Sequence, residues 1–177
     1  STLLGDWRTL DSNLEGKKFG GVVCLGSSIP YHSSWTQAAG SQAGNSVATP
    51  LAAEEREAVL KRVVENFRAG LKEDGVLVLG LSRHNERSRA GVKLQFEGEI
   101  RGVRYQMHWE FTFDWKTKRR TWNSTIQGEN GSQYAFEVDG HLFDHEELRD
   151  LCANYFTRVE LRDIAADHYD RYLVCRA

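Results

Sequence analysis

Two apolar runs separated by a helical pattern stand out in the first half of the chain. One run covers 19–25, with two adjacent valines at its centre, and the other covers 76–81. Short continuous apolar runs that contain β-branched residues are typical of strands covered on both faces. Between them, apolar residues from 59 to 71 recur every three or four positions, which predicts an amphipathic helix that starts near Thr49 and Pro50. Strand, helix and strand in this order predict a parallel pair and an α/β fold.

The period changes to two between 92 and 138. Apolar and aromatic residues alternate there with polar ones, and turns are expected at 101–102 and 115–118. This alternation predicts an antiparallel meander inserted after the second parallel strand. Its aromatic stripe runs from Tyr105 to Phe113 and allows two interpretations, a packed core or the wall of a substrate pocket.

The last part of the chain predicts a helix and a hairpin. Asp144 precedes a helical pattern of apolar residues, and two short strands at 158–164 and 169–175 follow it. Strands joined so closely form antiparallel hairpins, so we expect this pair at one edge of the sheet. An earlier turn is expected at 72–75, where Lys-Glu-Asp-Gly separates the first helix from the second strand.

The 177 residues, 40% of them hydrophobic, fit a single domain over 1–177 with a substantial core. The Ser-, Ala- and Gly-rich segment at 31–48 predicts a mobile loop after the first strand, either a surface insertion or a lid over a site. A net charge of −2 gives no general affinity for nucleic acid or for an anionic membrane. No apolar run is long enough to span a bilayer, so we expect a cytoplasmic protein.

The cysteines and histidines do not form a metal-binding pattern of known spacing. Cys24, Cys152 and Cys175 lie in apolar segments, which predicts buried, inert thiols rather than disulfides. His141 and His145 are four residues apart and could share a helix face, but no third ligand lies near them in the sequence. We therefore expect no bound metal.

The turn after the first strand is the first candidate site, because ligands in open α/β sheets bind outside the carboxyl ends of the strands. Gly26 and Ser27 would let a ligand approach the backbone there, although they do not complete the G-x-S-x-G pattern of a hydrolase. Asp6 could accept a hydrogen bond from an exocyclic amine, and Trp7 could cover a flat heterocycle. These are the requirements of an adenine nucleoside site. Neither a P-loop nor a G-x-G-x-x-G loop is present in the sequence.

A polar loop at 82–89 follows the second parallel strand and carries three arginines. Arg83 lies nearest the strand end, where a guanidinium is well placed to hold a substrate carboxylate or phosphate through two parallel hydrogen bonds. The alternative is a solvated surface loop.

Several segments, taken in order, resemble the second half of the cofactor site in class I S-adenosylmethionine-dependent methyltransferases. They are Gly5-Asp6-Trp7, Leu10-Asp11, the strand and turn from Phe19 to Ile29, and LKEDGVLVLGLSRHN at 71–85. The pattern is most similar to the glycine/sarcosine N-methyltransferase type, and the likeness continues through the antiparallel insertion to the closing hairpin. It implies a Rossmann-like methyltransferase sheet with an inserted antiparallel β meander and a terminal β hairpin.

The resemblance implies S-adenosylmethionine as the cofactor. Asp6 would lie near its adenine amino group, and Trp7 and Leu25 against the adenine ring. Ser27 would lie near the cofactor or the reacting centre, and Gly26 beside it belongs to the same cofactor-binding turn.

The same resemblance gives Arg83 the role of the arginine that holds a substrate carboxylate. Methyl transfer to an amine depends mainly on aligning a neutral lone pair with the methyl group, so positioning dominates. Tyr31 and His32 lie just after the turn and are candidate orienters of the substrate or acceptors of its proton.

The chain also departs from the family pattern. The family has Phe-Asp where this chain has Phe19-Gly20, and Asn where it has Ser27. The glycine-rich segment that holds the rest of the cofactor would precede Ser1, so we expect a fragment of a longer enzyme, or an oligomer that completes the sheet. The expected function is methyl transfer to a small amine-bearing, carboxylate-containing substrate. The alternative is a degenerate, non-catalytic module that acts as a binding or interaction partner.

Overall fold

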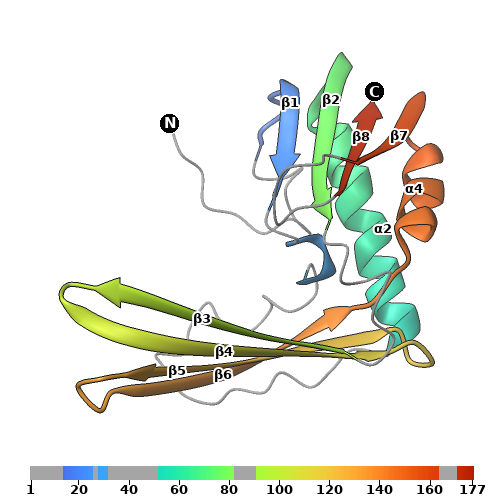
Figure 1. Cartoon of the computed structure of the whole chain (residues 1–177). Helices are drawn as coiled ribbons and strands as arrows, with labels where there is room; N and C mark the ends of the chain where they lie inside the picture. The colour runs from blue at the N-terminus through green and yellow to red at the C-terminus, as the bar shows by residue number, and fades with distance from the viewer. Residues whose placement is uncertain (1–13, 26–27, 32–51, 82–90, 164–170) are drawn as a thin grey trace.

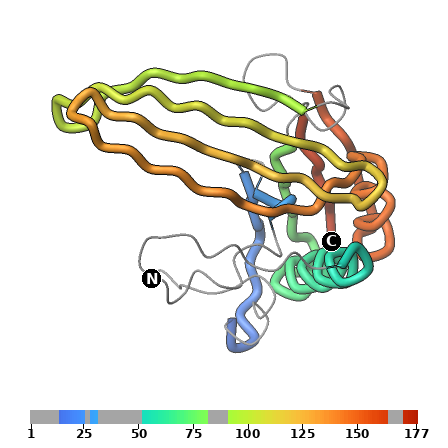
Figure 2. The backbone as a smooth tube through the Cα atoms, turned by 90° about the horizontal axis from the view of Figure 1, so that it is seen from below, coloured from blue at the N-terminus to red at the C-terminus, as the bar shows by residue number. Residues whose placement is uncertain are grey.

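The computed structural model of the chain describes residues 14–25, 28–31, 52–81, 91–163 and 171–177. They form two four-stranded sheets. Sheet A contains, in spatial order, β1 (Phe19–Cys24), β2 (Leu71–Leu81), β8 (Arg171–Arg176) and β7 (Arg158–Asp163). Sheet B contains β3 (Val92–Ile100), β4 (Val103–Asp114), β5 (Arg119–Gly128) and β6 (Gln133–His141). Sheet A stands upright in Figure 1 and sheet B lies across its lower end, and Figure 2 shows sheet B in front of sheet A when seen from below.

The strand directions in sheet A confirm the predicted α/β unit. β1 and β2 are parallel and are connected through helix α2 (Ala53–Ala69). β8 runs antiparallel to both β2 and β7, so the last two strands form the predicted antiparallel pair at one edge. The two parallel strands direct their carboxyl ends toward sheet B (Figure 1).

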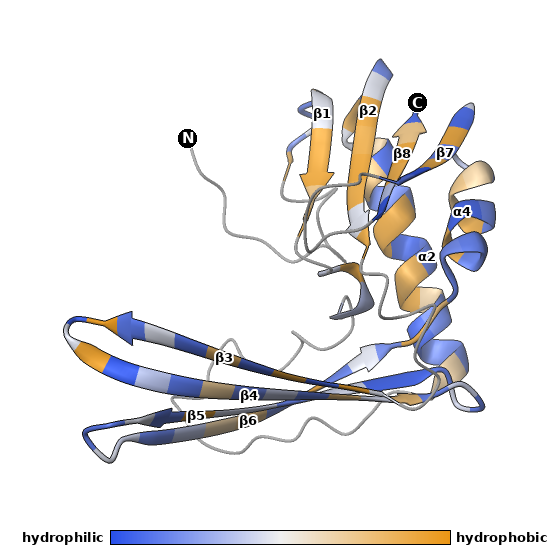
Figure 3. Cartoon of the chain, viewed as in Figure 1, coloured by the Kyte–Doolittle hydropathy of each residue, from blue (hydrophilic) through white to orange (hydrophobic). Residues whose placement is uncertain are grey.

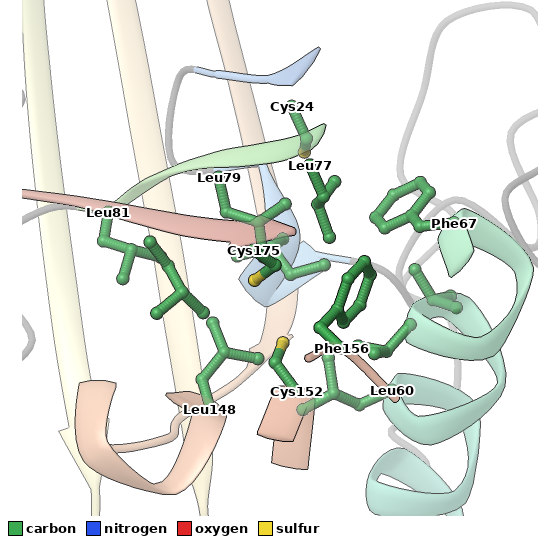
Figure 4. Packing of buried hydrophobic residues seen from close by; sticks show 14 of the residues in the cluster. Cys24, Leu60, Phe67, Leu77, Leu79, Leu81, Leu148, Cys152, Phe156 and Cys175 are labelled. Carbon is green, nitrogen blue, oxygen red and sulfur yellow. The ribbon is translucent and has the colours of Figure 1, made fainter. Parts of the chain in front are cut away.

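Helices α2 and α4 (His145–Ala153) cover one face of sheet A, and a single hydrophobic core fills the space between them (Figure 4). The core includes residues of both helices, of β2 and of β8: Leu60, Val63, Phe67, Leu77, Leu79, Leu148, Cys152, Leu173 and Cys175. Burying each leucine side chain stabilises the fold by roughly 1.5–3 kcal/mol. Cys24, Cys152 and Cys175 are all free and buried, which confirms the prediction of buried thiols.

The prediction that the first strand is covered on both faces is wrong. Exposed fractions reach 41% for Phe19, 62% for Val23 and 50% for Leu25, while Cys24 is buried. β1 is an edge strand, and the described helices pack on one face of its sheet only. An apolar run shows that both faces of a strand could be buried. Burial of the second face also requires other residues to pack against it, and none of the described residues do so at β1.

The turn predicted at 72–75 is also wrong, because β2 begins at Leu71 and includes these residues. The pairing with β1 shifts instead, from Phe19 opposite Leu71 to Gly21 opposite Val76. The polar residues 72–74 are exposed in this irregular part of the strand. A bulge therefore accommodates residues whose composition favours a turn.

Both helices begin at capped residues. At α2, the Ala52 backbone N–H donates to the Glu55 carboxylate at 2.9 Å, whereas the start predicted near Thr49 and Pro50 lies outside the described residues. At α4, the Asp144 carboxylate accepts a hydrogen bond from the backbone of Glu146, which confirms the predicted start. Neither described helix is long and apolar enough to cross a membrane.

Sheet B is the predicted antiparallel meander and extends three residues beyond the expected end at 138. Arg101 and Gly102 form its first turn with φ values of 53° and 78°, as a two-residue hairpin turn with both residues left-handed requires. Hydrophobic and hydrophilic residues alternate along its strands, whereas the second half of β2 in sheet A is more uniformly hydrophobic (Figure 3).

Candidate functional site

The candidate site lies where the carboxyl end of β1 meets sheet B (Figure 1). Just beyond this strand, Ser28 Oγ donates to the Leu25 carbonyl oxygen at 2.8 Å. The Tyr31 N–H then donates to the Ser28 carbonyl oxygen at 2.9 Å. These contacts lead into a short 3-10 helix, η2 (Ile29–Tyr31), whose three residues are all buried.

Helix η2 joins the two sheets. Ile29 is fully buried and belongs to the core of sheet A. Tyr31 packs on sheet B, where its ring centroid lies 5.9 Å from that of Trp122 and its ring edge contacts the backbone at Gly140. The end of β1 is therefore held against one particular face of sheet B.

That face carries nearly all the aromatic residues of sheet B, and we call it the aromatic face. Residues directly opposite each other on neighbouring strands lie on the same face, so the pairs Trp109–Ser124, Phe111–Trp122 and Ser124–Phe136 place all five residues together. The rings contact one another: Trp122 lies 5.2 Å from both Trp109 and Phe136, and 5.9 Å from Phe111. The opposite face is polar and carries ion pairs such as Lys93–Glu110.

The predicted aromatic stripe belongs to this face and not to the core of sheet A. Phe111 is buried, whereas Tyr105, Met107, Trp109 and Phe113 are only partly buried. The aromatic face is exposed to solvent near the turn between β5 and β6, where the exposed fractions are 61% for Tyr134 and 41% for Phe136. Figure 3 shows how hydrophobic and hydrophilic residues alternate along these strands. The stripe therefore packs at its buried end, at Phe111, and its interpretation as the wall of a substrate pocket stays a prediction.

Arg120 is the one charged side chain on the aromatic face among the described residues, and only 4% of it is exposed. Its guanidinium carbon lies 4.7 Å from the ring centre of Phe111, 5.2 Å from Tyr31 and 5.8 Å from Phe113. Such cation–π contacts stabilise a buried cation. Burial lowers the pKa of Arg120, and the nearby Tyr31 hydroxyl opposes that shift.

The Tyr31 hydroxyl is a proton donor at neutral pH. Burial raises its pKa above the ordinary value of 10.0, and the positive charge of Arg120 offsets this only in part. A side-chain hydrogen-bonding contact with Arg120 also lowers the pKa of Tyr31, but by less than burial raises it. A neutral phenol can orient a substrate, and its raised pKa disfavours the alternative role of a phenolate base.

Two of the predicted site residues, Leu25 and Tyr31, lie within the described residues, and both are at the carboxyl end of β1. Leu25 is half exposed and offers apolar surface beyond the strand end. The other six lie outside the described residues: Asp6, Trp7, Gly26, Ser27, His32 and Arg83. Their roles remain predictions.

The two histidines considered as metal ligands do not share a helix face. His141 ends β6, whereas His145 is the first residue of α4. Both are buried, and within the described ranges no three His, Cys, Asp or Glu side chains come together as a metal site would require.

Three residues that alternate along β5 on the aromatic face were not among the predicted site residues: Arg120, Trp122 and Ser124. The strand itself was predicted. A signal was present, because an arginine and a serine occupy positions where the period of two predicts apolar residues. A polar residue on an apolar face is costly to bury, so it usually indicates a specific interaction.

Neither a protein-family model nor a curated protein sequence matches the chain. Solved structures do. CalS10, an amino pentose methyltransferase of calicheamicin biosynthesis from Micromonospora echinaspora solved with S-adenosylmethionine bound, matches with a TM-score of 0.66 at 18% identity, over 98% of this chain and 63% of its own. DesVI from Streptomyces venezuelae matches with a TM-score of 0.65 at 21% identity, over 97% of this chain and 62% of its own.

The sugar N-methyltransferase KedS8 from Streptoalloteichus matches with a TM-score of 0.58 at 19% identity, over 91% of this chain and 57% of its own. The chain thus has a fold found in S-adenosylmethionine-dependent methyltransferases, and it spans about three fifths of the length of these structures. At these identities the likeness defines the fold and leaves the activity to be proposed.

Proposed function

We propose that this chain forms part of an S-adenosylmethionine-dependent methyltransferase that acts on a small amine-bearing acceptor. The fold likeness to CalS10, over 98% of the chain, carries the proposal. CalS10 and KedS8 are described as methyltransferases of an amino pentose and of a sugar nitrogen, which supports an amine as the acceptor. We also propose that the enzyme is of the glycine/sarcosine N-methyltransferase type. In that case the substrate carries a carboxylate, which Arg83 would hold.

The described residues offer a partial fit to the methyl donor. Leu25 presents apolar surface just beyond a parallel strand, as a flat adenine ring requires. Asp6, Trp7, Gly26 and Ser27 would complete this side of the donor site. The donor, when bound, supplies a methyl group activated by a sulfonium centre.

The chain's own contribution is positioning. Tyr31 is fixed by its contacts with Trp122 and Gly140, so its neutral hydroxyl can orient an acceptor amine. Alignment of the amine lone pair within bonding reach supplies most of the rate enhancement that such a reaction needs. His32 is the proposed acceptor of the proton that the methylated amine releases.

We further propose that a glycine-rich strand and helix outside the present sequence pair with the open edge of β1. Two observations support this: β1 lies at the edge of sheet A, and the exposed fractions of Phe19 and Val23, 41% and 62%, leave apolar surface on one of its faces. Exposed apolar edge strands are normally paired or covered. The same open edge favours a second candidate function, a non-catalytic module that uses it to bind a partner.

Calorimetric titration with S-adenosylmethionine tests the proposal on this chain and on an extended protein that carries the preceding glycine-rich segment. We expect the extended protein to bind the donor, and Leu25→Asp to weaken binding at least tenfold. Ile100→Asp is the matched control, because Ile100 is 64% exposed at the far end of sheet B and should leave binding unchanged. Failure of the extended protein to bind would reject methyl transfer, and a discrete heteromer in light scattering would then favour the interaction module.

A further inference from the structure

We propose that strand β3 pairs, antiparallel, with β3 of a second copy of this chain. The four strands of sheet B from each copy then form one continuous eight-stranded sheet. The interaction surface is the outer edge of β3 with the side chains along it. This inference concerns assembly and does not depend on the proposed methyl transfer.

The outer edge of β3 is open in the part of the chain that the structure describes. β3 is the first strand in the order of sheet B, so only its inner edge is paired, with β4. Figure 2 shows β3 along the side of sheet B that lies away from β1. An open edge presents unpaired backbone N–H and C=O groups, which readily bind a further strand.

β3 lacks several features that normally keep an edge strand single. It is nine residues long and contains no proline. All nine residues pair with β4 in a continuous register, so no bulge interrupts the strand. Proteins commonly shorten, kink or interrupt edge strands that must stay unpaired. A long and regular edge therefore indicates a strand that has a partner.

The turn at the end of β3 determines which residues face the open edge. Ile100 and Val103 pair across the two-residue turn at Arg101 and Gly102. In such a hairpin these flanking residues exchange their backbone hydrogen bonds, and bonded and non-bonded pairs then alternate along the strands. Four residues of β3 therefore direct their N–H and C=O groups outward: Lys93, Gln95, Glu97 and Glu99.

The charges along this edge suit an antiparallel copy of the same strand. Lys93 lies near the start of β3, whereas Glu97 and Glu99 lie near its end. A two-fold axis at Phe96 overlaps the full length of two β3 strands and places Lys93 opposite Glu99 of the second copy, once on each side of the axis. Opposite charges that face each other across two strands attract.

Lys93 is available for this contact. Its side chain is 81% exposed, and its Nζ lies 2.9 Å from Glu110 Oε1 on the neighbouring strand. Exposed ion pairs contribute little to stability, so the contact with Glu110 does not prevent a second carboxylate from approaching the ammonium group.

The same register covers apolar side chains on the aromatic face. Ile100 is 64% exposed, and it comes to lie opposite Val92 of the second copy. Phe96 lies opposite Phe96 of the second copy, where the side chains of a non-bonded pair approach most closely. Aromatic and β-branched pairs across strands stabilise a sheet, so the exposed end of β3 gains apolar neighbours.

The other edge of sheet B has no comparable charge pattern. β6 carries Glu137 and Asp139 and contains neither lysine nor arginine. Two copies of β6 would therefore gain no ion pair from each other. Self-complementarity of charge favours β3 as the edge that binds a second copy.

Size-exclusion chromatography with light scattering tests the pairing. We expect a discrete dimer for the unmodified chain. Lys93→Glu and Glu99→Lys should each raise the dimer dissociation constant about tenfold, because each places like charges opposite each other at two symmetric positions. An equimolar mixture of the two variants should restore the dimer, since opposite charges then face each other again. Such recovery also shows that both variants fold.

Two substitutions serve as matched controls. Glu137→Lys makes the same change of charge as Glu99→Lys, but on the other edge strand. Glu110→Gln removes the partner of Lys93 within the chain and leaves the outer edge of β3 intact. Both variants should dimerise as the unmodified chain does.

Four results would overturn the inference. They are a monomeric unmodified chain at millimolar concentration, a dimer that Lys93→Glu and Glu99→Lys leave intact, a mixture of these variants that stays monomeric, and assemblies that keep growing with concentration. Growing assemblies would indicate that β3 binds a different edge of the next copy, because only a two-fold contact closes at the dimer.

Discussion

The ring of Tyr31 lies against Gly140, so closely that a Cβ atom added to Gly140 would stand 2.9 Å from Tyr31 Cδ1. The same atom would stand 3.0 Å from the Pro30 carbonyl oxygen. The two residues come from different parts of the fold, since Tyr31 follows the last strand residue of β1 by seven positions and Gly140 lies in β6. The absence of a side chain at Gly140 is what allows the end of β1 to rest on the aromatic face.

Replacing this glycine should therefore loosen the site. Gly140→Ala is expected to destabilise the protein by about 1–3 kcal/mol, because the added methyl group overpacks the contact with Tyr31. Gly98→Ala is the matched control in the same sheet, since a Cβ atom there meets nothing within 4 Å. Urea unfolding measures the free energy of unfolding of both variants. Equal losses would show that the contact between Gly140 and η2 does not limit the side chain at this position.

A buried arginine of helix α2, Arg56, forms polar contacts with Asp139 of β6 and with the turn between β4 and β5. Arg56 is only 3% exposed; one of its terminal nitrogens lies 3.9 Å from Asp139 Oδ2, and the other donates to the Thr117 carbonyl oxygen. Asp139 also accepts a hydrogen bond from Arg119. We expect Arg56→Met to destabilise the protein by about 2 kcal/mol, because a hydrogen bond to a charged group is lost.

The exposed pair Arg104–Glu129, with its Nε and Oε2 atoms 3.1 Å apart, supplies the control for that substitution. Arg104→Met removes the same chemical groups from a solvated position and should cost at most about 1 kcal/mol. Chemical denaturation compares the two. A larger loss at Arg104 than at Arg56 would contradict the assigned role of the buried arginine.

The raised pKa of Tyr31 predicts a loss of stability in alkali. In the unfolded chain this phenol ionises near its ordinary value of 10.0, whereas burial keeps it neutral to a higher pH in the folded protein. The unfolded state therefore releases its proton first, and stability falls as the pH rises above about 10. Tyr31→Phe should make this fall shallower when melting temperatures are recorded between pH 8 and about 11.

Tyr155 provides an internal comparison for the alkaline measurement. Its pKa is raised to about 12, first by burial and then by its hydrogen bond to the Glu65 carboxylate. Tyr155→Phe should therefore also reduce the alkaline slope, although Tyr155 lies away from the aromatic face. If neither substitution changes the slope, the two phenols ionise alike in the folded and unfolded chains.

The cysteines should be inert in the folded protein. Burial raises the pKa of Cys24 to about 11, and its hydrogen-bonding contact with Cys175, together with burial, raises that of Cys152. Because the thiolate is the reactive form, we expect no rapid reaction with Ellman's reagent at pH 8. All three thiols should react in urea, and rapid labelling of the folded chain at one site would contradict their burial.

Local patterns were sufficient to predict most of the secondary structure. Asp144 caps α4 because a side-chain carboxylate can satisfy a free backbone N–H whatever surrounds it. The turn at Arg101 and Gly102 forms because its residues tolerate positive φ values. Local patterns failed where the structure depends on residues far apart in the sequence. The turn predicted at 72–75 is one example, because the pairing of β2 with β1 makes these residues part of a strand with a bulge.

The candidate site could be predicted only in part. Leu25 and Tyr31 follow an apolar strand, so their position at a strand end was visible in the sequence. The cluster of Arg120, Trp122 and Ser124 was not visible, because these residues come next to Tyr31 only when η2 packs on sheet B.

By itself, then, the sequence determined the order of strands and helices, the antiparallel meander and the burial of the cysteines, because hydrophobic period and local capping act over a few residues. Only the tertiary structure decided which face of each strand is covered. It left β1 half open and brought a buried arginine, a tyrosine and a serine onto one aromatic face. Contacts between residues some ninety positions apart have no local pattern, since they depend on how whole sheets pack against each other.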